Sequence, residues 1–571
     1  MATASQSGSL GDTEPHDMRW ADIAASLQAS STCGQVACIV GGGFTGLACA
    51  AGFAQRGYGV LVVDAVGPGS APASSAAAGL LDPLTTKGRL MWRGAEAFHA
   101  ASQLLTAVAA ARCDKEGVGT PFHSAHGALH VASGANHANV LRASASSLAR
   151  SADAAWLGLL WVDGDDPPSL VPNAHGTRSD ASLLSEAAAA AVECGAHCPH
   201  GALYCGCSAV IDTAQYLVQL WAHVQWQTAA RWEISRITDT RAMSAAFDHV
   251  VIACGAGALT IDETRCLPLD LCRGQVLEYT VAPPSTVTAA AAASATTTAA
   301  TAAATAAAQE GDASTGGTAL CVDDSLELAD ATPAALPLSG TAWCEPSLGQ
   351  DSKAKTATKT ATQAACWREL LGRLCVAVSG TVYLIPHLQA PSATGAAALL
   401  GPGPVLSRLD CGATHETTDD AAQLQGPQLE SAKATLTTPL LKLFPPLAAA
   451  GLPRCARAGV RAMPPRTAAG SIPLAGLAHT GSATQNVWTV GGMGSRGLLY
   501  HALLATWVVE AAVAHDPSTL PSEVRRGCFA EQLTAKLERL CAAQEGGRRR
   551  GALRRPQAAL AQPNSDALDL T

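Results

Sequence analysis

The sequence VACIVGGGFTGLACAAGFAQRGYGVLVVD, residues 36–64, predicts a strand, a glycine-rich turn, a helix and a second strand. Residues 36–40 and 60–64 are apolar runs in which only Asp64 is charged. Such runs are typical of parallel strands that helices cover on both faces. Residues 47–57 predict the helix that connects them. The chain is therefore expected to contain an α/β domain built on a parallel sheet.

The turn carries a GxGxxG motif made by Gly41, Gly43 and Gly46, and Asp64 ends the second strand. In such a motif the first glycine permits a tight turn, the second lets the backbone approach a pyrophosphate, and the third lets the helix pack closely on the sheet. The N–H groups at the helix start can bind phosphate, and Asp64 can accept a hydrogen bond from a ribose hydroxyl. This combination predicts a dinucleotide site that fits FAD and NAD equally well. A glycine turn in a parallel fold without any dinucleotide is the alternative.

A second glycine-rich turn lies more than 400 residues downstream, in residues 486–513. There a strand, the turn GGMGSRG (491–497) and an apolar helix follow one another. The start of this helix can stabilise the anionic reduced ring of a flavin, which an NAD dehydrogenase does not need. This turn favours FAD over NAD, although an ordinary helix start is an equally good interpretation of the turn alone.

Composition limits the classes of protein that remain. The 571 residues are 48% hydrophobic and 15% charged, and 37 basic against 46 acidic residues give a net charge of −9. This balance argues against nucleic acid or an anionic membrane as the main partner. The sequence contains no apolar run of about 18 residues, so no membrane span is expected. Residues 288–308 are only Ala, Thr and Ser, which predicts an insertion without a core of its own.

The 19 cysteines are scattered, and no signal peptide is recognisable at the N-terminus. Free thiols in a reducing compartment, cytoplasm or plastid, are therefore expected. One cluster combines cysteine and histidine: Cys194, His197, Cys198, His200, Cys205 and Cys207. Its CxxxC and CxC spacings do not match the paired CxxC spacing of zinc sites, so no metal is predicted.

Many segments follow one another in an order that resembles the FAD-dependent D-amino-acid oxidase superfamily, which includes glycine oxidase and sarcosine oxidase. The segments are GGGFTGL (41–47), SSAAAGLLDP (74–83), WRGAEAF (92–98), HGALHVA (126–132), GALYCGCSAVIDTAQYL (201–217), VVIACGAGA (250–258), CRGQVLEY (272–279), VYLIP (382–386), CGATHE (411–416), RAGVRAMPP (457–465), GSIPLAG (470–476) and GGMGSRGL (491–498). The GATHE and GSRGL segments are most similar to the oxidase domain of the bifunctional enzyme that makes methylaminomethyl-thiouridine in tRNA. The sequence departs from the family between residues 225 and 232, where the segment expected to hold a strand near the flavin is short.

The resemblance implies roles for individual residues. Arg461 matches the arginine that binds the substrate carboxylate. Arg496 is implied as a second catalytic-site residue, for which a flavin contact and a structural role are equally good interpretations. Asp64 is implied to bind the adenosine ribose. The residues implied to line the flavin ring are Ser74, Ser75, Ala78, Gly79 and Leu80. The residues implied to bind FAD are Gly41, Gly43, Phe44, Thr45, Gly46, Asp64, Ser74, Ser75, Gly79, Leu80, Ala253, Gly255, Gly494, Ser495, Gly497 and Leu498.

The resemblance also implies the organisation of the chain. The expected fold class is α/β, with a Rossmann-type FAD-binding domain and a mixed-sheet α+β substrate (cap) domain. Residues 1–32 are expected to be a disordered leader, and whether they form a transit peptide stays open. The predicted boundaries are 33–115, 208–262 and 455–515 for the FAD-binding domain; 116–207 and 263–454 for the substrate domain, with a low-complexity insertion at 284–318 and a polar loop at 346–365; and 516–571 for a C-terminal helix and basic tail.

The implied activity is oxidation of a C–N bond in an amino acid or secondary amine, with hydride transfer to FAD. The expected partners are this small substrate and oxygen or another electron acceptor. Two alternatives stay open: oxidation of a carboxymethylaminomethyl-type uridine in tRNA, against which the net charge argues, and a flavin-binding protein without turnover.

Overall fold

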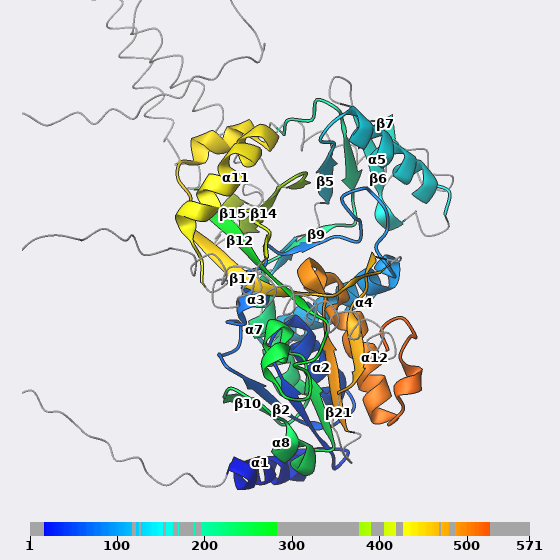
Figure 1. Cartoon of the computed structure of the whole chain (residues 1–571), viewed down its shortest axis with the longest axis vertical. Coiled ribbons are helices and arrows are strands. Elements are labelled where there is room, and N and C mark those ends of the chain that lie inside the picture. Colours follow the sequence, from blue (N-terminus) through cyan, green and yellow to red (C-terminus); the bar gives the residue numbers. More distant parts are fainter. Residues whose placement is uncertain are drawn as a thin grey trace, which may run out of the picture. The chain divides into compact units, whose positions relative to one another are not determined.

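The strand–turn–helix–strand unit predicted for residues 36–64 is present in the computed structural model. It consists of β1 (Val36–Val40), α2 (Phe44–Ala54) and β2 (Gly59–Asp64), shown in Figure 1. The helix begins three residues earlier than predicted, directly after Gly43. It ends before Gly57, whose φ of 83° lies in the left-handed region that a glycine adopts at no steric cost.

The structure describes residues 16–116, 122–124, 127–151, 156–163, 169–170, 188, 196–281, 376–389, 405–417, 426–467, 470–478 and 486–525. All of them belong to one compact unit, formed by Met1–Val281 and Leu370–Thr571. The predicted insertion (284–318) and polar loop (346–365) lie outside the described residues. Of the predicted C-terminal helix and tail, only 516–525 are described, with a single short helical turn, η7 (Pro517–Thr519).

A six-stranded sheet carries both predicted glycine turns. Its strand order is β10–β2–β1–β11–β21–β20, and all neighbours are parallel except β20, which is antiparallel to β21. This is the parallel sheet that the buried strand sequences predict. The further strands are β10 (Ala230–Ile234), β11 (His249–Ile252), β20 (Leu474–Leu477) and β21 (Val487–Gly491).

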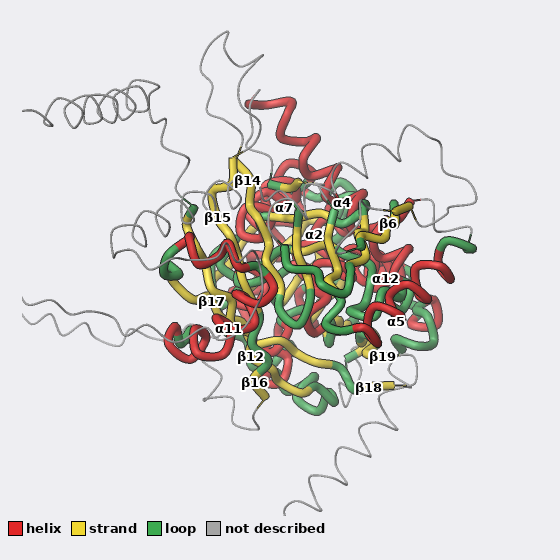
Figure 2. Tube along the Cα trace, turned by 90° about the horizontal axis from the view of Figure 1, so that it is seen from above, coloured by secondary structure: helices red, strands yellow, loops and turns green. Residues whose placement is uncertain are grey.

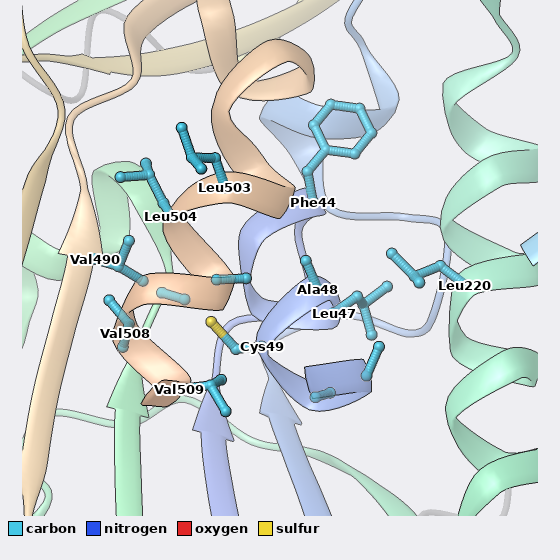
Figure 3. Packing of buried hydrophobic residues seen from close by; sticks show 14 of the residues in the cluster. Phe44, Leu47, Ala48, Cys49, Leu220, Val490, Leu503, Leu504, Val508 and Val509 are labelled. Atoms are coloured by element: carbon cyan, nitrogen blue, oxygen red, sulfur yellow. The ribbon is translucent and has the colours of Figure 1, made fainter. Parts of the chain in front are cut away.

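Helices cover both faces of this sheet because alternate strand residues point to opposite sides. Ile39 and Val62 face one core, which contains α2, α4 (Gly94–Glu116), α7 (Thr213–Gln227) and α12 (Gly497–Val513). Figure 3 shows α2 and α12 packed together through small and branched side chains such as Ala48 and Val508. Cys38 and Leu61 face the opposite core, which contains helix α8 (Arg241–Ala246).

The predicted disordered leader is wrong for residues 16–30, which form helix α1 (His16–Ser30). Four of its side chains, Trp20, Ile23, Ala24 and Leu27, are buried in the core below the sheet. The helix lies so close to β2 that a Cβ on Gly59 would stand 2.7 Å from the Leu27 carbonyl oxygen. The spacing i, i+3, i+4, i+7 of these apolar residues is the helical signal that the charged surroundings obscured. Residues 1–15 lie outside the described part.

The second large sheet has ten strands in the order β16–β12–β15–β14–β13–β5–β8–β6–β7, with β17 also paired to β12. Because β17 (Cys455–Met463) belongs to this sheet, the predicted start of the last FAD-binding segment at residue 455 is too early. The other strands are β5 (Ala128–Val131), β6 (Leu159–Val162), β7 (Ser169–Leu170), β8 (Ala202–Cys205), β12 (Asp270–Thr280), β13 (Ala377–Ser379), β14 (Tyr383–Gln389), β15 (Val405–Gly412) and β16 (Glu416–Thr417).

Helix α11 (Leu429–Leu443) packs its buried leucines on this sheet beside strands β12 and β15. Figure 2 shows the helix next to β12 and β17. Two small sheets, β3–β9–β4 and β18–β19, complete the described strands. The remaining elements are α3 (Pro72–Ser75), β3 (Leu80–Leu81), β4 (His123–Ser124), α5 (Ala135–Leu148), β9 (Ala209–Ile211), η2 (Gly255–Thr260), η5 (Pro445–Ala450), β18 (Arg466–Thr467), β19 (Gly470–Ser471) and η6 (Gly494–Arg496). The described residues thus form a parallel sheet between helices and a mixed sheet, as the predicted α/β fold requires.

Candidate active site

The turn between β1 and α2 has no room for side chains at two of its three motif glycines. Gly41 has a φ of 114°, and a Cβ there would stand 2.7 Å from the Ala253 carbonyl oxygen at the end of β11. A Cβ on Gly46 would stand 1.8 Å from the carbonyl oxygen of Gly41. The first glycine therefore permits the tight turn and the third permits close packing, as the motif predicts. Gly43, the residue before the helix, faces the Ser74 hydroxyl, 3.0 Å from where its Cβ would be.

Asp64, at the end of β2, is held by two backbone amides. Its Oδ2 accepts a hydrogen bond from the N–H of Gly42 at 2.5 Å, and its Oδ1 accepts one from Val66 at 2.9 Å. A carboxylate offers about four acceptor positions, so the predicted ribose contact has acceptor capacity left. Beside it the Trp232 indole of β10 donates to the Val66 carbonyl at 3.0 Å and covers Gly42. Sequence reasoning missed Trp232, which lies at the end of the segment judged too short.

The predicted flavin-lining segment, residues 74–80, lies against the start of α2. The Ser74 hydroxyl accepts a hydrogen bond from the Phe44 N–H at 3.2 Å. The Ser75 carbonyl accepts one from Arg457 of β17 at 2.9 Å. Gly79, with a φ of 89°, approaches the backbone of β9 so closely that a Cβ would stand 1.9 Å from the Ile211 carbonyl oxygen. Leu80 pairs with Val210 in the small sheet next to it.

The second glycine turn meets the first one in space. The Thr45 hydroxyl lies 3.1 Å from the sulfur of Met493, and a Cβ on Gly497 would stand 3.7 Å from the Phe44 ring. Gly494, with a φ of 55°, approaches Met463 at the end of β17. Ser495 is exposed, and Leu498 is buried in the first turn of α12. Two helix starts from opposite ends of the chain therefore converge, as the prediction of an FAD site requires.

Ala253 and Gly255 lie after β11, on the other side of the first turn. The Ala253 N–H donates to the Val40 carbonyl at 2.8 Å, which extends the sheet to the edge of the turn. Gly255 has a φ of 57°, and no atom lies within 4 Å of the position its Cβ would take. These positions are compatible with the predicted role beside the cofactor.

Arg496 is a cation inside the protein without a direct partner in the described part of the chain. Burial lowers the pKa of its guanidinium, and Asp82 and Tyr500 only partly oppose this effect. No carboxylate among the described residues lies within 4 Å of it, because Asp82 is engaged elsewhere, 3.2 Å from the His130 imidazole and 3.1 Å from the Ser208 hydroxyl. A half-buried guanidinium in this state is suited to an anionic group of a ligand.

Arg461 is the other predicted arginine, and it lies on β17 in the ten-stranded sheet. Its Nη2 donates to the Thr414 carbonyl at 3.0 Å and lies 3.7 Å from the Cys272 sulfur. Its Nε is buried without a partner in the described residues. No carboxylate in that part of the chain forms an ion pair with it. Arg461 is two residues from Met463, which contacts the second glycine turn.

Arg457 lies four residues earlier on β17 and, unlike Arg461, has carboxylate partners. It pairs with Asp410, which is fully buried, and its Nε lies 3.4 Å from Glu278. Burial raises the pKa of Asp410, but His387 and the two arginines next to Asp410 lower it below its usual value. Of the two arginines on β17, Arg457 is therefore neutralised by carboxylates of the described residues, and Arg461 has no such partner among them.

The cysteine–histidine cluster is described only in part. Cys194 lies outside the described residues, and within them no group of three or more potential ligands is close enough to hold a metal ion. Cys205 and Cys207 have their sulfurs 3.5 Å apart. Burial raises the pKa of the Cys198 thiol to about 12, so this thiol is protonated at neutral pH.

None of the described helices has the length and apolar character needed to cross a membrane.

The model of a sequence family described as DAO, FAD dependent oxidoreductase, matches residues 37–336. The match spans more than half of the 571 residues, and the chain belongs to this family of FAD-dependent oxidoreductases. No curated protein sequence matches the chain.

Solved structures with a similar fold include a glycine oxidase and an L-amino acid deaminase. Glycine oxidase from Geobacillus kaustophilus is 16% identical with a TM-score of 0.51, over 84% of this chain and 95% of that one. L-amino acid deaminase from Proteus myxofaciens in complex with anthranilate is 10% identical with a TM-score of 0.50, over 87% of this chain and 93% of that one. At these identities the likeness shows the fold alone. The resemblance to the tRNA-modifying oxidase domain is not confirmed by these comparisons.

The described residues fit the FAD that this family uses. The glycine turn leaves no room for side chains where it packs on the protein, and the start of α2 offers the N–H groups that a pyrophosphate needs. The α12 start and Arg496, which has no direct partner among the described residues, supply positive charge from the other end of the chain. The glycines and Asp64 were predictable from the sequence, because these positions depend on local backbone geometry. No role was predicted for Thr414, Glu416 or Gly274, although all three lie in the segments CGATHE and CRGQVLEY.

Proposed function

We propose that this FAD-dependent oxidoreductase oxidises the C–N bond of an amino acid or a secondary amine that carries a carboxylate. The observation that carries the proposal is the contrast on β17. Arg457 is neutralised by Asp410 and Glu278, whereas Arg461 has no carboxylate partner in the described part of the chain. A partly buried guanidinium without a counter-ion favours binding of an anionic ligand.

The bonds of Arg461 define how a carboxylate would reach it. Its Nε is buried, and one N–H of Nη2 is occupied by the Thr414 carbonyl. The second N–H of Nη2 contacts the Cys272 sulfur at 3.7 Å, a weak acceptor that a carboxylate would displace. The edge formed by Nη1 and this N–H is the edge proposed for a ligand. Two parallel N–H donors match the two oxygens of a carboxylate, and such a bidentate contact fixes the ligand's orientation. Arg461 would therefore set the position of the α-carbon in the substrate.

Bound FAD supplies the hydride acceptor for the α-hydrogen, and the imine product is then hydrolysed by water. The protein's own groups orient the substrate and stabilise charge. Arg461 binds the carboxylate, and Arg496 with the start of α12 stabilises negative charge at the pyrimidine end of the cofactor site. Because the neutral amine needs no base for this reaction, no catalytic triad is part of the proposal. Oxygen or another acceptor then receives the electrons.

The first test is the absorption spectrum of the purified protein with added FAD. We expect the yellow flavin bands to stay with the protein through gel filtration. A protein that remains colourless after incubation with FAD would contradict flavin binding by this chain.

The second test measures anaerobic bleaching of the bound flavin with glycine, sarcosine and a panel of D- and L-amino acids. Arg461→Ala should weaken the apparent affinity for any working substrate by about 100-fold, since a charged hydrogen-bonded pair contributes about 3 kcal/mol. Arg454→Ala is the matched control, because Arg454 lies just before β17 and is mostly exposed. An unchanged affinity in Arg461→Ala would refute the carboxylate role. Absence of bleaching by every compound would favour the flavin-binding alternative without turnover.

A further inference from the structure

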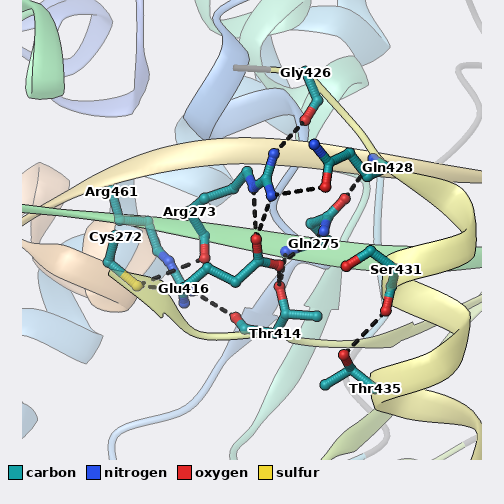
Figure 4. Close-up of polar contacts among 10 residues, drawn as sticks. All are labelled: Cys272, Arg273, Gln275, Thr414, Glu416, Gly426, Gln428, Ser431, Thr435 and Arg461. Carbon is teal, nitrogen blue, oxygen red and sulfur yellow. Dashed lines mark hydrogen bonds and ion pairs between the residues drawn. The ribbon is translucent and has the colours of Figure 1, made fainter. Parts of the chain in front are cut away.

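We propose that Glu416 and Thr414 are positioning residues that fix the carboxylate-binding edge of Arg461. This inference rests on the proposed function, because it assumes that Arg461 binds the substrate carboxylate. It adds a reason why this arginine is available for a ligand at all, and it assigns a role to the CGATHE segment. Figure 4 shows the residues involved.

The guanidinium of Arg461 lies over a glycine of the neighbouring strand. In the register of β12 and β17, Arg461 is paired with Cys272, and its side chain extends along β12 to Gly274. A Cβ on Gly274 would stand 2.4 Å from Nη2 and 2.6 Å from Cζ of Arg461. Because Gly274 has no side chain, the guanidinium can lie directly on the backbone of β12, and this placement buries its Nε. The glycine alone sets how close the group lies, but it does not set the rotation of the guanidinium in its plane.

The Thr414 carbonyl supplies the contact that sets this rotation. It accepts a hydrogen bond from Nη2 of Arg461 at 3.0 Å. Thr414 is itself held through its backbone N–H and its side-chain hydroxyl. Its N–H donates to the Gln275 carbonyl at 3.1 Å, and its hydroxyl accepts from the Gln275 N–H at 2.9 Å. The same hydroxyl donates to Glu416 at 2.6 Å. Three hydrogen bonds from Thr414 to Gln275 and Glu416 thus fix the carbonyl that contacts Arg461.

The Glu416 carboxylate connects Thr414 to two side chains of β12, Gln275 and the buried Arg273. Oε1 accepts from the Thr414 hydroxyl and from the Gln275 side-chain amide at 2.8 Å. Oε2 accepts from Nε of Arg273 at 2.8 Å and also from its Nη2. Burial raises the pKa of Glu416, but hydrogen bonds from Thr414, Gln275 and Arg273 and the charge of Arg273 hold it below its usual value. Glu416 is therefore ionised at neutral pH.

The engagement of Glu416 also explains why Arg461 has no carboxylate partner among the described residues. Glu416 is the nearest acidic residue in the segment that contacts Arg461, two positions after Thr414. Both of its oxygens are directed to Arg273, Gln275 and Thr414, and Arg273 is only 4% exposed. Arg273 thus neutralises Glu416, so that this carboxylate does not compete with a substrate for Arg461. The sequence places an acid close to the binding arginine and the fold directs it away.

The test compares threonine variants of the FAD-loaded protein. The probes are acetate, measured by its perturbation of the flavin absorption spectrum, and the amino acid that bleaches the flavin fastest. Thr414→Val removes the hydroxyl bond to Glu416 and should raise the acetate Kd and the substrate KM about tenfold, the effect of one hydrogen bond to a charged group. The loss should appear in KM rather than in kcat. Thr414→Ser keeps the hydroxyl and should restore most of the affinity.

A matched control is Thr435→Val on helix α11. Its hydroxyl donates to the Ser431 carbonyl at 3.0 Å within the helix and has no contact to Arg461 among the described residues. This variant should bind acetate as the unchanged protein does. Glu416→Gln is the second variant, since an amide group in place of Oε2 opposes the Arg273 guanidinium; it should raise the acetate Kd at least as much as Thr414→Val.

The outcomes separate this inference from the function on which it rests. If Arg461→Ala weakens acetate binding while Thr414→Val and Glu416→Gln do not, the positioning role is wrong and the carboxylate site stands. If Arg461→Ala leaves acetate binding unchanged, the proposed function itself fails. If Glu416→Gln does not fold, the comparison of Thr414→Val with Thr414→Ser decides alone. A serine variant as weak as the valine variant would also overturn the inference, because it would show that the hydroxyl does not matter.

Discussion

Replacing Gly46 by alanine should weaken FAD binding, because it displaces the start of α2. A Cβ at this position would stand 1.8 Å from the Gly41 carbonyl oxygen, which is backbone and cannot rotate away. The start of α2 must move by about 1.5 Å before the two atoms reach ordinary van der Waals separation. A shift of this size takes the first-turn N–H groups out of hydrogen-bonding range of a bound pyrophosphate. Loss of two such bonds to a charged group costs about 3 kcal/mol, which corresponds to about a 100-fold rise in the Kd of FAD.

The assay is titration of the FAD-free protein with FAD, followed by the quenching of flavin fluorescence. Gly52→Ala is the matched control, because Gly52 lies in the same helix and its Cβ would meet only a methyl group of Val509 at 3.2 Å. That methyl can give way, and alanine favours the helix by about 1 kcal/mol. Gly52→Ala should therefore bind FAD within a factor of about three of the unchanged protein. A folded Gly46→Ala protein with the same FAD affinity as Gly52→Ala would refute the close-packing argument.

Three further predictions concern the described core and the charges near the site. Leu27→Ala should lower the free energy of unfolding by about 3 kcal/mol in urea titrations, whereas Ser26→Ala on the exposed side of α1 should not; equal stabilities would mean that α1 does not pack on the sheet. Burial lowers the pKa of His501 to about 4. The neutral form therefore contributes its full stability above pH 6.5, and the free energy of unfolding falls by about 3 kcal/mol as the pH drops from there toward 4. Urea midpoints measured across this range should fall less steeply for His501→Gln; parallel curves would contradict the assignment. Arg496→Met should lower the two-electron midpoint potential of bound FAD by about 30 mV, if Arg496 stabilises negative charge on the reduced cofactor with about 1.4 kcal/mol; an unchanged potential in a redox-dye titration would place Arg496 away from the flavin.

Much of the parallel sheet was predictable from local sequence. Residues 36–64 combine continuous apolar strands with glycines whose positions follow from close backbone approach, and the strand and helix of 486–513 follow the same rule. The prediction failed for α1, because its apolar stripe is interrupted by polar and acidic residues and becomes a buried face only where Gly59 lets it approach β2. It also misplaced β17, since the sequence of this strand does not state which of two sheets it joins.

The sequence by itself determined the cofactor turn. The requirements for Gly41 and Gly46 come from backbone atoms a few residues away, and a short motif can express them. The state of the two arginines on β17 was decided only by the tertiary structure. Arg457 and Arg461 are four residues apart and equally basic in sequence, but Asp410 and Glu278 reach Arg457 from other strands, while Arg273 of β12 holds Glu416 away from Arg461. Charge compensation depends on which side chains meet across the sheet, and long-range strand pairing sets that.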